Sequence, residues 1–391
     1  MSTVSPPTRD APPQAGAGAL ETPMYSRRQS VRRAARLLAL AGLLCTCAGP
    51  RPAHASPRQD VAGRRQQQQQ RGPSADSVRQ TIARARGGSL DDAGFAEARA
   101  VGYELIRAAR FEEAAALFGA LAARSPEDAA TLYGAALSAF NAKRAAEAEP
   151  FARRAAEVAL AAGGAKEGAA DALVLLAVVL AVRGDDAGSL LAARQAADLA
   201  PRNFDAQFTL GRALYGAGDS AGASRAFRAA VALKPGDARA HFFLATTLER
   251  AGADAEALGA YRELARLRPD EAEGHLGLGV LLVKRGGAGV EEGLGELARA
   301  IEIRPDLYEA RVTLGRALVA RGRAAEAVEH LKRAAALAPD NPEPHYQLSL
   351  AYRRLGRTEE AAAESEIVRR IHASRRAAGA SAPGTQPPPK P

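Results

Sequence analysis

Apolar and small residues return at fixed intervals between polar ones along residues 95–375, with a period of about 34 residues. Prolines mark this period, because the gaps between five successive prolines are 34, 34, 36 and 34 residues. Proline has no backbone N–H and ends a helix, so each proline closes one unit. A period of this length is typical of stacked supersecondary units. The five prolines are Pro201, Pro235, Pro269, Pro305 and Pro339.

Two positions carry a small residue in every unit, which predicts two closely packed helices per unit. Two antiparallel helices can approach closely only where the contacting residues of both helices are small. A leucine at either position would overpack the pair. We therefore predict an all-α chain of eight antiparallel helix-turn-helix units. The units are 95–128, 129–162, 170–203, 204–237, 238–271, 272–307, 308–341 and 342–375. The eighth residues are Gly102, Ala136, Ala177, Gly211, Ala245, Gly279, Gly315 and Ser349, and the twentieth are Ala114, Ala148, Ser189, Ala223, Ala257, Gly293, Ala327 and Ala361.

The units resemble the tetratricopeptide repeat (TPR). A good example is residues 204–235, FDAQFTLGRALYGAGDSAGASRAFRAAVALKP. The resemblance covers about 95–375 and suggests an exported, bacterial-type TPR protein. It implies a right-handed superhelical α-solenoid whose first helices line a concave groove and hold other proteins. The chain departs from the family at the fourth position, usually a large aromatic, which holds Gln207, His241, His275, Arg311 and His345.

The resemblance also implies which residues face the groove, namely the second, fifth, ninth, twelfth and thirteenth of each first helix. The groove would be aromatic and aliphatic with arginines between, and would suit an apolar or helical segment or an extended peptide with acidic groups. Alternatively, some of these side chains pack against neighbouring first helices. The Lys and Asn set that binds a C-terminal carboxylate in some relatives is absent, and its places hold Arg99, Tyr103, Gly134, Asp171 and Leu175. The implied groove residues are Tyr133, Phe140, Val174, Val178, Phe208, Arg212, Tyr215, Phe242, Arg316, Tyr346 and Arg353.

Three segments depart from the regular period. Residues 163–169 are expected to lengthen the connection between the second and third units. The sixth unit has two extra residues in its Gly-rich turn, 286–289. Residues 75–94 are expected to form a leading helix, with Val78 and Ile82 on one face.

The first 55 residues contain the three regions of a secretory signal in their usual order. From Met24, a basic stretch precedes the apolar run 37–44, and Ala53-His54-Ala55 forms a small-x-small cleavage site. The apolar run is much shorter than the roughly 20 residues that span a bilayer. We therefore expect a start at Met24, cleavage after Ala55, export to the periplasm or cell envelope, and no transmembrane span in the mature chain. The basic residues are Arg27, Arg28, Arg32, Arg33 and Arg36.

Other interpretations of the N-terminus stay open. Arg27-Arg28 resembles a twin-arginine signal, and Cys47 is a candidate for lipidation in an envelope-assembly lipoprotein. A basic helix without a targeting role would leave a cytoplasmic adaptor. Residues 56–74, with five consecutive glutamines, are expected to be a disordered linker, and residues 376–391 a disordered Pro-rich tail.

Charge and composition argue against other functions. The formal net charge is +9, but residues 1–55 hold seven arginines and two acids, which leaves 9 − 5 = +4 for the rest. Arginines alternate with Asp and Glu along the units, so no basic stripe for nucleic acid is expected. The repeats also leave no room for a separate catalytic domain of a sugar- or peptide-transferring enzyme.

Candidate chemistry is sparse in the repeats. Both cysteines, Cys45 and Cys47, precede residue 55, so no thiol site is expected in the mature chain. His241, His275 and His345 recur at one position, but equivalent residues of neighbouring units are separated by a helix-pair width of roughly 10 Å. A zinc ion needs its ligands within about 2 Å. We therefore expect no metal, no cofactor and no catalytic residues, and a non-enzymatic scaffold for a protein or peptide; the sequence leaves its oligomeric state open.

Overall fold

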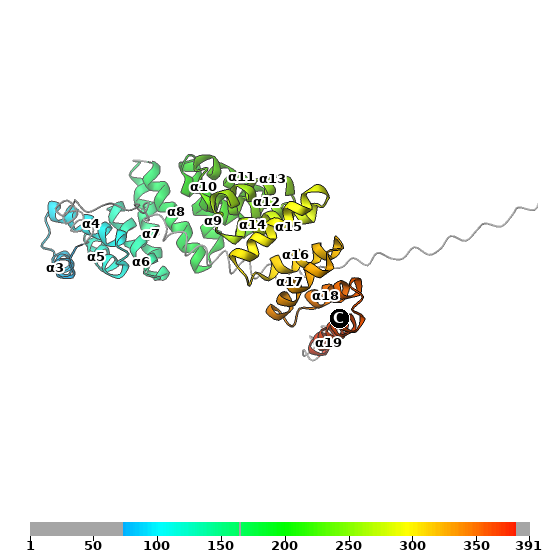
Figure 1. Cartoon of the computed structure of the whole chain (residues 1–391). Helices are drawn as coiled ribbons and strands as arrows, with labels where there is room; N and C mark the ends of the chain where they lie inside the picture. The colour runs from blue at the N-terminus through cyan, green and yellow to red at the C-terminus, as the bar shows by residue number, and fades with distance from the viewer. Residues whose placement is uncertain (1–72, 164–165, 381–391) are drawn as a thin grey trace, which may run out of the picture. The chain divides into compact units, whose positions relative to one another are not determined.

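The computed structural model describes residues 73–163 and 166–380, and this part of the chain consists of helices joined by short turns, without strands (Figure 1). A leading helix, α3 (Ala75–Arg86), precedes eight hairpins. The first helices of the hairpins are α4 (Asp92–Arg107), α6 (Ala129–Asn141), α8 (Lys166–Arg183), α10 (Phe204–Ala217), α12 (Ala238–Arg250), α14 (Ala272–Arg285), α16 (Tyr308–Ala320) and α18 (Pro342–Arg354). The second helices are α5 (Phe111–Arg124), α7 (Ala145–Ala161), α9 (Asp186–Leu199), α11 (Ser220–Leu233), α13 (Asp254–Leu267), α15 (Val290–Ile303), α17 (Ala324–Leu337) and α19 (Thr358–Ala380).

The main contacts join helices that are one or two places apart in the sequence. Every helix packs against the next, and several neighbouring first helices also contact each other, such as α6 with α8, α8 with α10 and α10 with α12. This is the contact pattern of a solenoid, in which each hairpin buries its apolar face against its neighbours. The predicted all-α solenoid of helical hairpins is confirmed.

Local sequence signals set where each hairpin begins and turns. α10 begins after Asn203, whose side-chain oxygen accepts a hydrogen bond from the N–H of Ala206 at 3.0 Å. The helix ends at Gly218, which adopts a left-handed conformation (φ 85°) that glycine tolerates best. Asp219 then caps α11 by accepting from the N–H of Gly222 at 2.8 Å. The turn between the two helices is therefore short enough to hold them antiparallel.

The small residues allow the helices of a hairpin to pack closely. A Cβ built on Gly211 of α10 would lie 2.7 Å from Cδ1 of Phe227 on α11. In the sixth unit, a Cβ on Gly279 would lie 2.9 Å from the carbonyl oxygen of Gly293. The prediction that the eighth and twentieth residues face each other is confirmed there, and the Gly211 contact shows that a ring from the second helix also occupies this space.

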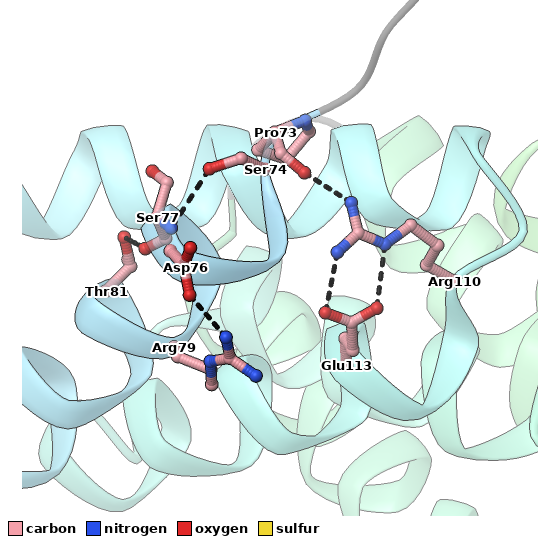
Figure 2. Close-up of polar contacts among 8 residues, drawn as sticks. All are labelled: Pro73, Ser74, Asp76, Ser77, Arg79, Thr81, Arg110 and Glu113. Carbon is pink, nitrogen blue, oxygen red and sulfur yellow. Dashed lines mark hydrogen bonds and ion pairs between the residues drawn. The ribbon is translucent and has the colours of Figure 1, made fainter.

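Helix α3 covers the N-terminal end of the repeats. Val78 is fully buried in a cluster with Leu105, Leu117 and Leu121. Polar contacts hold the start of α3 in place, because the Arg110 guanidinium donates to the carbonyl oxygen of Pro73 and also pairs with Glu113 at 2.7 Å (Figure 2). Ser74 caps the helix by accepting from the N–H of Ser77 at 3.2 Å.

Several sequence-derived boundaries differ from the structure. The expected leading helix 75–94 ends at Arg86, and α4 already begins at Asp92. Residues 166–169 belong to α8 and not to a connection, because Ala169 packs into the core as part of that helix. Helix α19 continues to Ala380, so the first five residues of the expected tail 376–391 are helical.

The expected signal segment 1–55 lies outside the described residues, as does the expected linker except for its last two residues, Pro73 and Ser74. Among the helices of the described part, none has the length and apolar character needed to cross a bilayer.

Candidate partner-binding site

The first helices carry the implied groove residues, and the structure separates these residues into exposed and buried ones. Phe140, Val178 and Phe208 are only 6–8% exposed. They belong mainly to the core, in agreement with the alternative that some of the set pack between helices. Tyr133, Val174, Arg212, Tyr215 and Phe242 are partly buried, and Arg316, Tyr346 and Arg353 are exposed.

Phe208 is buried because it lies within a group of aromatic rings in the fourth and fifth units. Its ring centroid is 5.6 Å from that of Phe204, 5.8 Å from that of Phe227 and 5.5 Å from that of Phe243. Such rings contribute stability beyond their buried area through edge-to-face contact. Phe208 therefore offers little surface to a partner, whereas Phe242 remains partly accessible.

Cationic side chains surround this aromatic group. The Lys234 ammonium is 4.3 Å from the centroid of the Phe204 ring, and the Arg239 guanidinium is 5.4 Å from that of Phe208. Arg250 lies 5.1 Å from the Tyr215 ring and donates to the Tyr215 carbonyl oxygen at 3.4 Å. The end of α11 and the first helix α12 therefore present positive charge next to aromatic surface.

Helices α8 and α10 contact each other, and we call their two facing rows of side chains the α8–α10 seam. Beside them lies a cleft of about 70 Å³, lined by Val178, Arg212 and Asp186 together with small residues and Thr209 from α8, α9 and α10. A cleft of this size accepts a small apolar side chain or one or two waters. The rows of the seam are Asp171, Val174, Val178 and Ala181 on α8, and Asp205, Thr209, Arg212 and Gly216 on α10.

Arg212 lies in this seam without a counter-ion. In the described part of the chain its guanidinium forms neither a hydrogen bond nor an ion pair. Burial, and then the nearby charge of Arg239, lower the pKa of Arg212 below its usual value. Arg239 itself is paired with Asp237 at 2.7 Å. Asp186 lines the same cleft but forms no ion pair with Arg212 within the described residues, and a mostly buried cation without an ion pair is costly, which makes Arg212 a suitable contact for an anionic group.

The opposite end of the seam is acidic. Burial first, and then the charges of Asp205 and Glu167, raise the pKa of Asp171, although Asn203 donates to its carboxylate at 3.1 Å and acts in the other direction. Burial and the nearby Asp171 raise the pKa of Tyr133 to about 12, with smaller effects from Tyr103 and Asp205. These interactions place Tyr133 and the two aspartates close together.

Ion pairs join neighbouring units along the second helices. Arg228 of α11 pairs with Glu256 of α13 at 2.6 Å, and Arg262 of α13 pairs with Glu292 of α15 at 2.9 Å. On the first helices, Arg316 resembles Arg212 in forming no ion pair within the described residues. The cations at the ninth position of these units are therefore available to a partner.

The histidines of the fourth position hold helices together. His275 Nδ1 is 2.6 Å from Glu296, and His345 Nδ1 is 2.6 Å from Glu364. Over residues 73–163 and 166–380, no group of three or more His, Cys, Asp or Glu side chains is arranged to hold a metal ion. In four units the fourth side chain also contacts the carbonyl oxygen of the preceding proline: Gln207 with Pro201 at 3.2 Å, His241 with Pro235 at 2.9 Å, His275 with Pro269 at 3.3 Å and Arg311 with Pro305 at 2.6 Å.

Sequence reasoning missed two members of the face. Asp205 and Arg239 both occupy the second position of their units. That position was expected to face the groove, so the repeat register contained the signal. The implied groove residues were mostly aromatic and aliphatic, and the charged residues at the second position were not among them.

Comparisons with known proteins agree with the repeat architecture. Residues 99–165 and 208–272 match a family model described as tetratricopeptide repeat, and residues 315–356 match one described as TPR repeat. The C-terminal part of a TPR repeat-containing protein from Cytophaga hutchinsonii is 14% identical, with a TM-score of 0.51 over 64% of this chain and 99% of that one. At this identity the likeness supports the fold alone.

Two further solved structures are similar over shorter stretches. YrrB, described as a TPR protein with an unusual peptide-binding site, is 23% identical over 49% of this chain and 95% of its own, with a TM-score of 0.43. MamA from Desulfovibrio magneticus RS-1 is 18% identical over 44% of this chain and 96% of its own, with a TM-score of 0.41. No curated protein matches the chain.

Proposed function

We propose that these tetratricopeptide repeats hold an apolar or helical segment, or an extended peptide, of another protein on the face formed by the first helices. The repeats themselves are those of a protein-interaction scaffold. The observation that carries the choice of face is the burial of Arg212. This first-helix arginine is largely buried yet has no hydrogen bond or ion pair among the described residues, whereas arginines of second helices either pair with the next unit, as Arg262 does, or are exposed to solvent, as Arg225 is.

Partly exposed aromatic side chains on the same face support the proposal. Tyr215 and Phe242 lie on adjacent first helices next to the aromatic group of the fourth and fifth units. Tyr346, on α18, is 51% exposed. Aromatic and arginine side chains contribute much of the binding energy at protein interfaces. A partner segment would therefore gain apolar contact from the rings and a charged contact from the arginines.

Peptide selection tests this function. The full chain is used to select from a phage library of random 12-residue peptides, and affinities of the enriched peptides are measured by fluorescence anisotropy. The double variant Tyr215→Ala, Phe242→Ala should bind at least about tenfold more weakly, which corresponds to about 1.4 kcal/mol. The control Leu191→Ala removes a side chain that is 61% exposed on second helix α9 and should bind as the wild type does. Equal affinities for all three proteins would refute the proposed face.

We further propose that the scaffold acts outside the cytoplasm, in the periplasm or cell envelope. The order of basic, apolar and small residues before Ser56 supports export. Fractionation of the native cell with N-terminal sequencing tests it, because a mature end at Ser56 is expected. An intact Met in the cytoplasm would favour a cytoplasmic adaptor, and a modified Cys47 a lipoprotein.

We propose no catalytic role for the scaffold. Two of the histidines that recur at the fourth position have structural partners, in the pairs His275–Glu296 and His345–Glu364. Proteins built from such repeats generally hold partners and leave chemistry to them.

A further inference from the structure

Opposite charges lie at two places along the α8–α10 seam. The acidic end holds Asp171 and Asp205, the second residues of their units, and Arg212 lies seven residues after Asp205 on the same helix. Seven residues of α-helix rise by about 10 Å. Val174 and Val178 lie on the facing row of α8, and Val178 lines the cleft beside Arg212. The seam is therefore polarised along its length, with aspartates at one end and the cleft at the arginine.

Neither charge is neutralised by the described part of the chain. Arg212 has no ion pair or hydrogen bond there, and Asp186, which lines the same cleft, forms no ion pair with it. Within the described residues, Asp171 receives a hydrogen bond from the neutral amide of Asn203 and forms no ion pair, and Asp205 forms none either. Many other charges of the repeats are paired, as Arg262 is with Glu292 at 2.9 Å. A buried unpaired arginine in a cleft, with exposed aspartates along the same helices, favours a partner of complementary charge.

We propose, building on the peptide-binding function above, that the bound segment carries one acidic and one basic side chain about 10 Å apart. The acidic side chain meets Arg212, and the basic side chain meets Asp171 and Asp205. A small apolar side chain next to the acidic one enters the cleft beside Val178 and Arg212. Ten ångströms corresponds to about three residues of an extended segment or seven of a helix. The seam thus fixes the direction in which the segment lies.

The test compares the peptides selected by charge-reversed variants. The full chain, the variant Arg212→Glu and the double variant Asp171→Lys, Asp205→Lys each select from the phage library of random 12-residue peptides. Wild-type peptides should be enriched in an acid and a base three or seven residues apart. Arg212→Glu should lose the preference for the acid and keep that for the base, and the double variant should do the reverse.

Arg225→Glu is the matched control, because Arg225 is an exposed arginine on second helix α11 and undergoes the same charge change. Wild-type peptides should bind Arg212→Glu at least about tenfold more weakly and Arg225→Glu within about twofold. Circular dichroism checks folding, and Arg212→Gln replaces Arg212→Glu if the latter is unfolded. Enriched peptides without a paired charge pattern would overturn this inference while leaving peptide binding intact. Failure of the wild type to enrich any peptide would overturn both.

Discussion

The ring of Phe118 on α5 occupies the space next to Gly134 on α6. A Cβ built on Gly134 would lie 2.4 Å from Cε1 of Phe118, a separation that Cβ atoms do not adopt. The same ring also limits Gly102 on α4, where a Cβ would lie 2.6 Å from Cε2. One phenyl group therefore sets the spacing of two successive first helices.

Replacing Gly134 by valine should therefore destabilise the first two hairpins. Overpacking of a filled core typically costs about 1–3 kcal/mol, because the ring must leave its rotamer or the helices must separate. Urea unfolding followed by circular dichroism should show a lower midpoint. Gly119→Ala is a suitable control, since a Cβ there meets no atom within 4 Å, and it should be neutral or stabilise by up to about 1 kcal/mol. A normal midpoint for Gly134→Val would contradict the packing.

Val78→Ala shortens a side chain of the leading helix. The substitution should destabilise only the leading helix and the N-terminal hairpin. Val78 is fully buried against the cluster around Leu117, and loss of its methyl groups should cost about 1–3 kcal/mol. Hydrogen exchange measured by mass spectrometry should show faster exchange in α3 to α5. Because units contact mainly their neighbours, exchange in α16 and α17 should stay unchanged. Uniform acceleration along the array would contradict this local effect.

His330 on α17 should make stability fall as the pH becomes acidic. Burial, and then the charge of Arg311, lower the pKa of His330 below 6.5, while Glu329 and Glu326 act in the opposite direction. Its Nδ1 is also buried and has no hydrogen-bond partner among the described residues. The folded state therefore favours the neutral ring, so its contribution is complete above about pH 6.5 and is lost as the pH falls through the lowered pKa.

The measurement is the urea midpoint at pH 7.5 and pH 5.0 for the wild type and for His330→Leu. The wild-type midpoint should fall more than that of the variant, because leucine has no charge to gain. Parallel decreases in the two proteins would show that other groups cause the acid effect.

Asp171→Asn should stabilise the unliganded protein at neutral pH. The pKa of Asp171 is raised, so the folded state favours its neutral form, and ionisation at pH 7 works against folding. The gain should stay below about 1 kcal/mol, because the side chain is partly exposed and its charge is screened by solvent. The difference in urea midpoint should disappear below about pH 3.8, where the carboxyl is protonated in both states. Asp198→Asn, at an exposed position on α9, is the control and should change little at either pH.

The hairpins could be predicted from sequence because their signals are local and repeated. A small residue such as Gly211 and a terminating Pro235 recur at fixed distances, so each unit supports the interpretation of the others. Irregular segments lack that support. Lys166–Ala169 interrupts the period and was expected to form a loop, yet its residues extend α8 by a turn and bury Ala169.

The candidate site was harder to predict because the exposure of each side chain depends on which side chains of neighbouring helices pack against it. Phe208 and Phe242 occupy the same position in successive units, but only Phe208 meets three other rings and is buried. Likewise, the family resemblance implies that Arg212 faces the groove, but the repeat register cannot show that Arg212 lacks an ion pair within the described residues. Such differences arise from contacts between units. A repeat pattern describes only the features that the units share, so it does not contain these differences.

The neighbour-only contacts of the helices also determine how the protein would respond to mechanical force. A pull on the two ends loads every hairpin in series, because the main contacts within the described residues join helices that are one or two places apart. The array should therefore extend one hairpin at a time, in steps of about 34 residues. When a terminal hairpin opens, the α8–α10 seam keeps both of its walls, so a scaffold under tension can lengthen without releasing what it holds.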